Sequence, residues 1–185
     1  DDAVRVVVIR GAGAHFCAGH NLKEMAARRS DADGGLGYFR ALFQTCSEVM
    51  LRITQLPQPV IAEVSGIATA AGCQLVAACD LAVASNDARF ATSGVNIGLF
   101  CSTPLVALSR TVARKHAMEM LLTGGFIAAQ QAVGMGLANR AVPGDELADA
   151  TRPLAVDIAT KTPAPIHVGK RLSHYPATLS LAAAY

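Results

Sequence analysis

The sequence contains no tryptophan and few charged residues. Of its 185 residues, 16% are Asp, Glu, Lys or Arg, against roughly 25% in an average soluble domain. The net charge is +2, and no block of basic residues interleaved with aromatics occurs. These absences argue against a nucleic-acid-binding protein. The apolar content is high, at 52%. It predicts a sizeable core and apolar surface that meets other subunits.

Paired cysteines and metal-ligand motifs are also lacking. The five cysteines are odd in number, form no C-x-x-C pair and lie mostly in apolar segments, so we interpret them as reduced packing residues. His15 and His20 are five residues apart with no acidic partner in register. We therefore predict no metal site.

Long apolar runs are absent as well. No run reaches the roughly 18 residues that a membrane-spanning helix needs, and the start DDAVRVVVIR lacks the plan of a signal peptide. We expect a soluble protein without membrane partners. Its expected location is the cytoplasm, or the mitochondrial matrix if the source is eukaryotic.

The stretch GIATAAGCQLVAACD, residues 66–80, carries small and apolar residues on every face of a 3.6-residue helix. Such a helix has no solvated face and is predicted to run through the core. The small residues Ala70, Ala71 and Gly72 leave the N–H groups of its first turn open to another molecule. The positive end of the helix dipole suits an oxygen that becomes negative during a reaction.

Strand and helix patterns alternate along the rest of the chain, which predicts an α/β fold with one domain over residues 1–185. A dinucleotide-binding loop is excluded after the first strand, because G-x-G-x-x-G needs glycine where Phe16 stands. Pro153 is expected to kink or restart the final long helix. The strands are expected at 4–9, 16–18, 60–64, 81–84, 89–91 and 140–142, and the longer helices at 39–53, 105–122 and 128–135. The apolar residues of 39–53 recur at helical spacing and are expected mostly to face the core. Gly124 and Gly125 are expected to end the helix of 105–122.

Two motifs at matching spacing resemble the enoyl-CoA hydratase/isomerase (crotonase) family. FCAGHNLKEM at 16–25 fits F-x-A-G-x-[DN]-L-K-E-M, and residues 66–80 fit G-x-A-x-x-x-G-x-x-L-x-x-x-C-D, with PQPVIA at 57–62 between them. The resemblance covers nearly the whole chain. It implies the ClpP/crotonase-like spiral of β-β-α units, here without the family's N- and C-terminal segments.

The resemblance also implies a site for a CoA thioester, with no permanently bound cofactor. The backbone N–H groups of His20 and Ala71 would hold the carbonyl oxygen, while the imidazole of His20 is more simply an ordinary loop side chain. The family assembles as homotrimers or dimers of trimers, which we expect here. The other implied CoA-contacting residues are Ala18, Asn21, Leu22, Lys23 and Gly72.

By the same matching, the two glutamates that hydratases use fall on Gln74 and Gly94. Gln74 can hold a water molecule but cannot accept its proton, and Gly94 offers no side chain. Efficient hydration by the usual route is therefore not expected. The predicted function is an acyl-CoA-binding hydratase/isomerase-like protein of fatty-acyl-CoA metabolism. The alternative is a non-catalytic acyl-CoA-binding or scaffold protein on the same fold.

Overall fold

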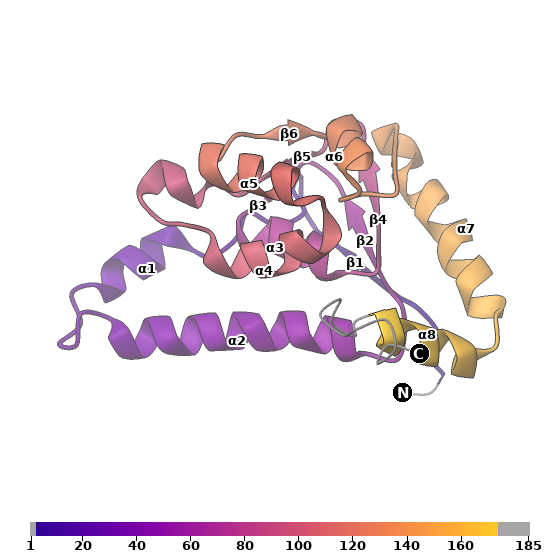
Figure 1. Ribbon diagram of the computed structural model, residues 1–185, viewed down its shortest axis with the longest axis horizontal. Helices are drawn as coiled ribbons and strands as arrows, with labels where there is room; N and C mark the ends of the chain where they lie inside the picture. Colours follow the sequence, from indigo (N-terminus) through magenta and orange to yellow (C-terminus); the bar gives the residue numbers. More distant parts are fainter. Residues whose placement is uncertain (1–2, 174–185) are drawn as a thin grey trace.

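The computed structural model describes residues 3–173, and a four-stranded parallel sheet forms its centre (Figure 1). The strand order is β1-β2-β4-β7. Residues on β2 (Val60–Val64) alternate between two cores. Ile61 packs with Leu147 of helix α7 (Leu147–Thr160), whereas Ala62 and Val64 pack on the side of helix α3 (Ala71–Ala78). The inner strands β2 and β4 are thus covered on both faces, which explains their mostly apolar sequences, whereas β1 at the sheet edge alternates between half-buried and exposed residues. The strands are β1 (Val7–Arg10), β2 (Val60–Val64), β4 (Leu81–Ser85) and β7 (Arg140–Val142).

A second, smaller sheet has the order β3-β5-β6, with β3 parallel to β5 and β5 antiparallel to β6. Eight α-helices and two short 3-10 helices complete the part of the chain that the structure describes. The strands are β3 (Ile67–Thr69), β5 (Arg89–Ala91) and β6 (Ile127–Ala128). The α-helices are α1 (Leu22–Arg28), α2 (Leu36–Gln55), α3 (Ala71–Ala78), α4 (Ser102–Thr111), α5 (Arg114–Thr123), α6 (Ala129–Met135), α7 (Leu147–Thr160) and α8 (Pro163–Ser173). The 3-10 helices are η1 (Ser93–Ile97) and η2 (Gly144–Glu146).

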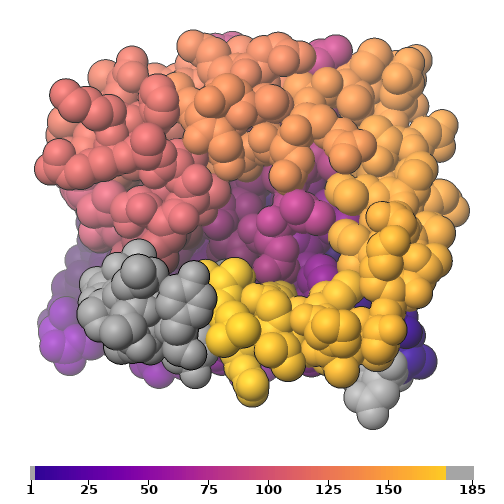
Figure 2. Space-filling model, turned by 45° about the vertical axis from the view of Figure 1, so that its right-hand side comes forward, coloured from indigo at the N-terminus to yellow at the C-terminus, as the bar shows by residue number. Residues whose placement is uncertain are grey.

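The helix predicted within residues 66–80 is α3, and it is shorter than the pattern suggested. Residues 67–69 pair with β5 as a strand instead, so the helix begins only at Ala71. Most of α3 is buried, but Ala71 and Leu75 are partly exposed. On the face drawn in Figure 2, magenta segments from the middle of the chain lie recessed between orange helices and yellow α8. Burial raises the pKa of the Cys73 thiol to about 12, as expected of an inert packing residue.

Three other expectations differ from the structure. Residues 16–18 form only one bridge, from Cys17 to Ala68, because the segment turns away at Gly19. The helical pattern of 105–122 is divided into α4 and α5, since Val112 and Ala113 have extended backbones. Helix α7 continues through Pro153, so of the two outcomes expected at this proline, a kink or a restart, the restart is contradicted.

Helix α2 carries the apolar stripe that was expected to face the core, yet only Ile53 on it is buried. Phe43 is 39% exposed and Val49 is 45% exposed. The stripe instead faces two cavities beside α1 and α3, described below. The spacing predicted the helix correctly. The prediction that most of its apolar residues are buried in the core was wrong, because several of them line cavities instead.

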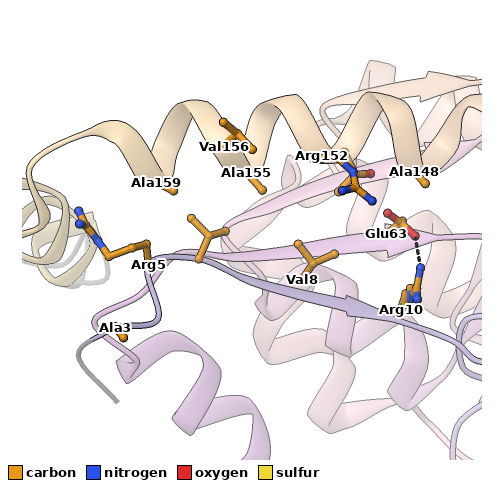
Figure 3. Close-up of a pocket in the computed structure, with 12 residues that line it drawn as sticks. Ala3, Arg5, Val8, Arg10, Glu63, Ala148, Arg152, Ala155, Val156 and Ala159 are labelled. Atoms are coloured by element: carbon orange, nitrogen blue, oxygen red, sulfur yellow. Dashed lines mark ion pairs between the residues drawn. The ribbon is translucent and has the colours of Figure 1, made fainter.

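Strand β1 forms one edge of the larger sheet, and a groove of about 490 Å³ separates it from α7 (Figure 3). Glu63 of β2 lines this groove and forms an ion pair with Arg10, with 4.0 Å between Oε1 and Nη1. The carboxylate of Glu63 therefore points away from the cavities at α3. It cannot serve as an acid there.

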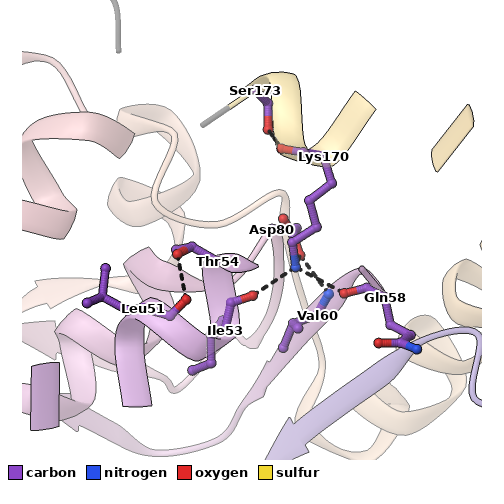
Figure 4. Close-up of polar contacts among 8 residues, drawn as sticks. All are labelled: Leu51, Ile53, Thr54, Gln58, Val60, Asp80, Lys170 and Ser173. Atoms are coloured by element: carbon purple, nitrogen blue, oxygen red, sulfur yellow. Dashed lines mark hydrogen bonds and ion pairs between the residues drawn. The ribbon is translucent and has the colours of Figure 1, made fainter. Parts of the chain in front are cut away.

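A buried ion pair holds α8 against the far end of α3 (Figure 4). The Nζ atom of Lys170 lies 2.6 Å from Oδ2 of Asp80 and donates to the carbonyl oxygens of Ile53 and Gln58. The same Oδ2 accepts a hydrogen bond of 2.7 Å from the N–H of Val60. Asp80 thus has a structural role at the end of α3 that lies away from Ala71.

Candidate functional site

Two backbone segments meet where the loop after Cys17 reaches the start of α3. The N–H of Cys17 donates to the carbonyl of Ile67 at 3.1 Å, and the N–H of Thr69 donates to the carbonyl of Cys17 at 3.0 Å. A Cβ atom at Gly72 would collide with the Cys17 carbonyl oxygen. Only glycine at position 72 allows this close approach.

The approach brings the loop of His20 beside the first residues of α3. Gly19 has φ +89°, and a Cβ atom there would lie 3.4 Å from the backbone nitrogen of Ala71. Within residues 3–173, no hydrogen bond engages the N–H of His20 or of Ala71. No side chain caps α3 either. Two unengaged amide donors therefore lie close together at the positive end of a buried helix.

The backbone immediately before the second donor is strained. Ala70 has φ 51° and ψ −118°, and it is the one non-glycine residue with positive φ in the described chain. Such a conformation costs roughly 1–3 kcal/mol. Ala71, which follows it, is helical with an ordinary negative φ. Alanine at position 71 is therefore compatible with a donor at that place.

Two cavities border these amides, and His20 and Ala71 line both of them. The first, which we call the apolar cavity, has a volume of about 320 Å³ and also contacts Gly94 and the start of α4. The second cavity, of about 520 Å³, lies between the His20 loop and α2. A ligand whose polar atom met the two amides could extend into either cavity.

The apolar cavity contains no carboxylate among its described lining residues. Its walls include large apolar side chains with a high exposed fraction, such as Ile97, which is 57% exposed, and Phe100, which is 48% exposed. The same cavity is also lined by the residues at the start of α4, which are Cys101, Ser102, Thr103 and Pro104. The cavity therefore suits an apolar chain better than a charged group.

Position 94 has no room for a side chain. A Cβ atom on Gly94 would lie 2.6 Å from the carbonyl oxygen of Leu99 and 2.8 Å from Sγ of Cys101. The N–H of Leu99 donates to the Gly94 carbonyl at 2.9 Å, which closes the turn over that position. The place that the resemblance implied for a glutamate is thus filled by neighbouring backbone and thiol.

Gln74 lies one helical turn after Ala71 but does not line either cavity. Its side chain is buried, and its Oε1 atom has no hydrogen-bond partner in the described chain. An unpaired buried amide oxygen is costly and calls for an explanation. The structure does not bring Gln74 together with the two amide donors in one cavity wall.

The remaining predicted contact residues divide into three groups. Ala18 and Leu22 line the apolar cavity, whereas Asn21 lines the second cavity. Asn21 also caps α1, since its Oδ1 atom accepts from the N–H groups of Lys23 and Glu24. Lys23 is exposed outside both cavities, and Gly72 serves the close approach to Cys17.

His20 lines the apolar cavity, and its imidazole lies against Phe43 of the same wall, which the sequence did not indicate. Its ring meets the edge of Phe43 at 5.6 Å between centroids, with 83° between the planes. Desolvation by partial burial lowers the pKa of His20. Phe43 itself was missed as a cavity residue, because its spacing on α2 is that of a core stripe.

The fold and the two converging loops define a class: a spiral α/β protein with amide donors at the start of a buried helix. The model of the "Enoyl-CoA hydratase/isomerase" family matches residues 1–184. The chain belongs to this family, and its fold is crotonase-like, as the motifs implied. Within residues 3–173, no helix is long and apolar enough to cross a membrane, and no cluster of three or more His, Cys, Asp or Glu residues could hold a metal ion.

Individual relatives are similar to this chain over nearly its full length, in sequence and in structure. Enoyl-CoA hydratase domain-containing protein 3, mitochondrial, of Xenopus laevis is 48% identical over 185 residues, covering 100% of this chain and 61% of that protein. The crystal structure of enoyl-CoA hydratase from Mycobacterium smegmatis is 52% identical with a TM-score of 0.92, covering 100% of this chain and 70% of that one. The crystal structure of human enoyl Coenzyme A hydratase domain-containing protein 3 is 48% identical with a TM-score of 0.90, and the match covers 98% of this chain and 70% of that one. The chain spans about three fifths of the length of the curated relatives it matches.

Proposed function

We propose that the protein binds acyl-CoA thioesters and polarises their carbonyl group between the N–H groups of His20 and Ala71. The observation that carries the proposal is the close approach of these two unengaged amides at the junction of two cavities. An enolate formed beside the carbonyl would be stabilised by both donors. Preset donors of this kind are worth on the order of 10²–10³ in rate each.

The chemistry that best fits the cavity is enolate formation without addition of water. Hydration needs a base that activates water, and the apolar cavity has no carboxylate among its described residues. Gln74 cannot take a proton, and the turn at Leu99 occupies the space at Gly94. We therefore propose an isomerase-like or related proton-transfer activity in fatty-acyl-CoA metabolism, with weak hydratase activity.

The acyl chain is proposed to enter the apolar cavity, because Leu22, Ile97 and Phe100 offer it large apolar surfaces. The proposed assembly is a homotrimer or a dimer of trimers. The names of the relatives from Xenopus laevis and Homo sapiens place those proteins in mitochondria. The matrix is accordingly the proposed compartment for a eukaryotic source.

A non-catalytic acyl-CoA-binding or scaffold role is the second candidate. The lack of a carboxylate among the described residues of the apolar cavity favours it, since binding needs only the amides and the apolar walls. The two candidates share the thioester site and differ only in whether a proton is moved.

The test compares two ligands of equal chain length on the full-length protein. Butyryl-CoA carries the carbonyl oxygen, whereas S-butyl-CoA is the thioether without it. Two hydrogen bonds of about 1 kcal/mol each predict roughly 10- to 100-fold tighter binding of the thioester in calorimetry. Equal affinities of the two ligands contradict the proposal.

Turnover then separates the two candidates. Conversion of 3-enoyl-CoA to 2-enoyl-CoA, followed by absorbance of the conjugated thioester, supports the enzyme. Thioester-selective binding without isomerisation or hydration supports the scaffold. Hydration at an ordinary hydratase rate contradicts the argument from Gln74 and Gly94.

A further inference from the structure

The apolar cavity needs a proton carrier if it is to form an enolate, and its described lining offers few groups that ionise in water. They are the imidazole of His20 and the thiol of Cys101. Glu24 lines the second cavity and not the apolar one. Glu63 pairs with Arg10 at the sheet edge beside α7, and Asp80 pairs with Lys170 at the far end of α3. Glu119 is exposed on α5 and lines neither cavity.

His20 is distinguished from Cys101 by its place beside the donors. The same residue presents its backbone N–H at the amide pair and its ring in the wall of the apolar cavity. The ring therefore lies within one side-chain length of any carbonyl held by that N–H. Phe43 packs edge-to-face against the ring and limits its orientation.

We propose that the imidazole of His20 is the catalytic base and acid of this site, and the proposal rests on the function proposed above. The neutral ring takes a proton from the α-carbon, and the C–H electron pair moves toward the carbonyl oxygen to give an enolate held by the two amides. In an isomerisation the imidazolium then returns this proton to the γ-carbon, with the double bond re-forming between the α- and β-carbons. Protons and electrons balance without water or another reactant.

The surroundings of His20 keep its ring in the neutral form that a base requires. Cys101 at the start of α4 lines the apolar cavity together with His20, while Glu24, Tyr38, Cys17 and Cys46 line the second cavity together with it. Desolvation is the cause of its lowered pKa, and no charged neighbour contributes. Because this pKa is lowered from the ordinary histidine value, the neutral imidazole is the main form at neutral pH, and protonation removes the base only in more acidic solution.

The experiment measures exchange of the α-protons of butyryl-CoA with D₂O by NMR, using the full-length protein. This exchange needs an enolate and a base but no productive turnover. For His20→Gln we expect a loss of roughly 10²- to 10⁴-fold in exchange rate, the usual contribution of a general acid–base group. The variant keeps its backbone N–H, so the affinity for butyryl-CoA is expected to change by less than about threefold. The matched control is His116→Gln on α5, outside both cavities, with an unchanged exchange rate.

The pH profile gives a reading that a purely structural role would not produce. The wild-type exchange rate should rise with pH, following the titration of His20, and level off once the ring is neutral. The inflection should lie below the ordinary histidine value of about 6.5. In His20→Gln this inflection should vanish.

Three outcomes overturn the inference. If His20→Gln exchanges protons within threefold of the wild type, another group is the base. If the wild-type protein binds butyryl-CoA selectively but never exchanges its α-protons, the site binds without catalysis. If it does not bind butyryl-CoA at all, the proposed function fails first, and the binding measurement reveals that separately.

Discussion

At Gly72 and at Gly94, another segment of backbone comes closer than any side chain at these positions would allow. The two close approaches have opposite consequences for the site. At Gly72 the Cys17 carbonyl comes so close that a Cβ atom would collide with it, and the His20 loop is thereby held beside unengaged amides. At Gly94 the turn from Leu99 to Cys101 folds onto the position and fills it. One close approach presents hydrogen-bond donors, while the other removes the space for an acid.

The largest expected effect comes from Gly72→Ala. The added methyl group meets a backbone carbonyl that is itself fixed by hydrogen bonds to β3, so neither side can give way easily. We expect the free energy of unfolding to fall by about 3 kcal/mol, at the upper end for an overpacked site. Chemical denaturation followed by circular dichroism measures this change.

Gly134→Ala is the matched control for this change. Gly134 lies in α6, and a Cβ atom added there would have no neighbour within 4 Å, so alanine should raise the unfolding free energy by about 0.5–1 kcal/mol. A Gly72→Ala protein as stable as the wild type would show that the donor loop does not depend on this close approach.

Gly94→Ala should destabilise the protein less, by about 1–2 kcal/mol. One of its two close neighbours is the thiol of Cys101, a side chain that can shift, whereas both nearest neighbours of Gly72 are backbone atoms. The same denaturation experiment compares the two variants. A loss at position 94 that exceeds the loss at position 72 would reverse the ranking.

The double variant Gln74→Glu, Gly94→Glu tests the functional side of the comparison. The two replacements place glutamate at both positions where the resemblance implies the glutamates of a hydratase. The side chain at position 94, however, has no space unless Leu99 moves. We expect no efficient hydration of crotonyl-CoA by this variant in an absorbance assay. Gain of an ordinary hydratase rate would mean that the turn opens readily, and that only the acids were absent.

The smallest expected effect is a gain at Ala70→Gly. The backbone of Ala70, at φ 51° and ψ −118°, is one that glycine adopts without the strain of a Cβ atom. Relief of about 1–3 kcal/mol, reduced by the greater entropy of glycine in the unfolded chain, predicts a net increase of about 1 kcal/mol in unfolding free energy. A decrease in stability would indicate that the backbone of Ala70, next to the amide donor of Ala71, is not strained. The difference between this region and the turn at Gly94 would then be smaller than we infer.

Much of the fold was predictable because local patterns report local physics. The apolar runs at 60–64 and 81–84 predicted strands, and β2 and β4 confirm them. Gly124 was correctly expected to end a helix, since its φ of +62° is one that glycine favours. The strand at 67–69 was missed, because it exists only through its pairing with β5, a partner more than twenty residues away.

The site was predictable in its backbone and less so in its side chains. The motifs led to His20 and Ala71 by resemblance, and the structure brings their segments together. The same matching put Gln74 and Gly94 at the chemistry, yet Gln74 lies outside both cavity walls and position 94 is filled. The ring of His20 and the face of Phe43 gave no signal, since a loop histidine and a helical apolar residue look alike in a site and in ordinary packing.

The sequence by itself determined the elements, the small residues at the start of α3 and the absence of glutamate at positions 74 and 94. Those properties depend on residue type and on spacing along the chain. Only the tertiary structure decided that the turn at Leu99 fills position 94, that α2 faces cavities, and that the ring of His20 lies in a cavity wall. Each of these depends on contacts between segments far apart in sequence, and the distances across such contacts are set by how the whole chain packs.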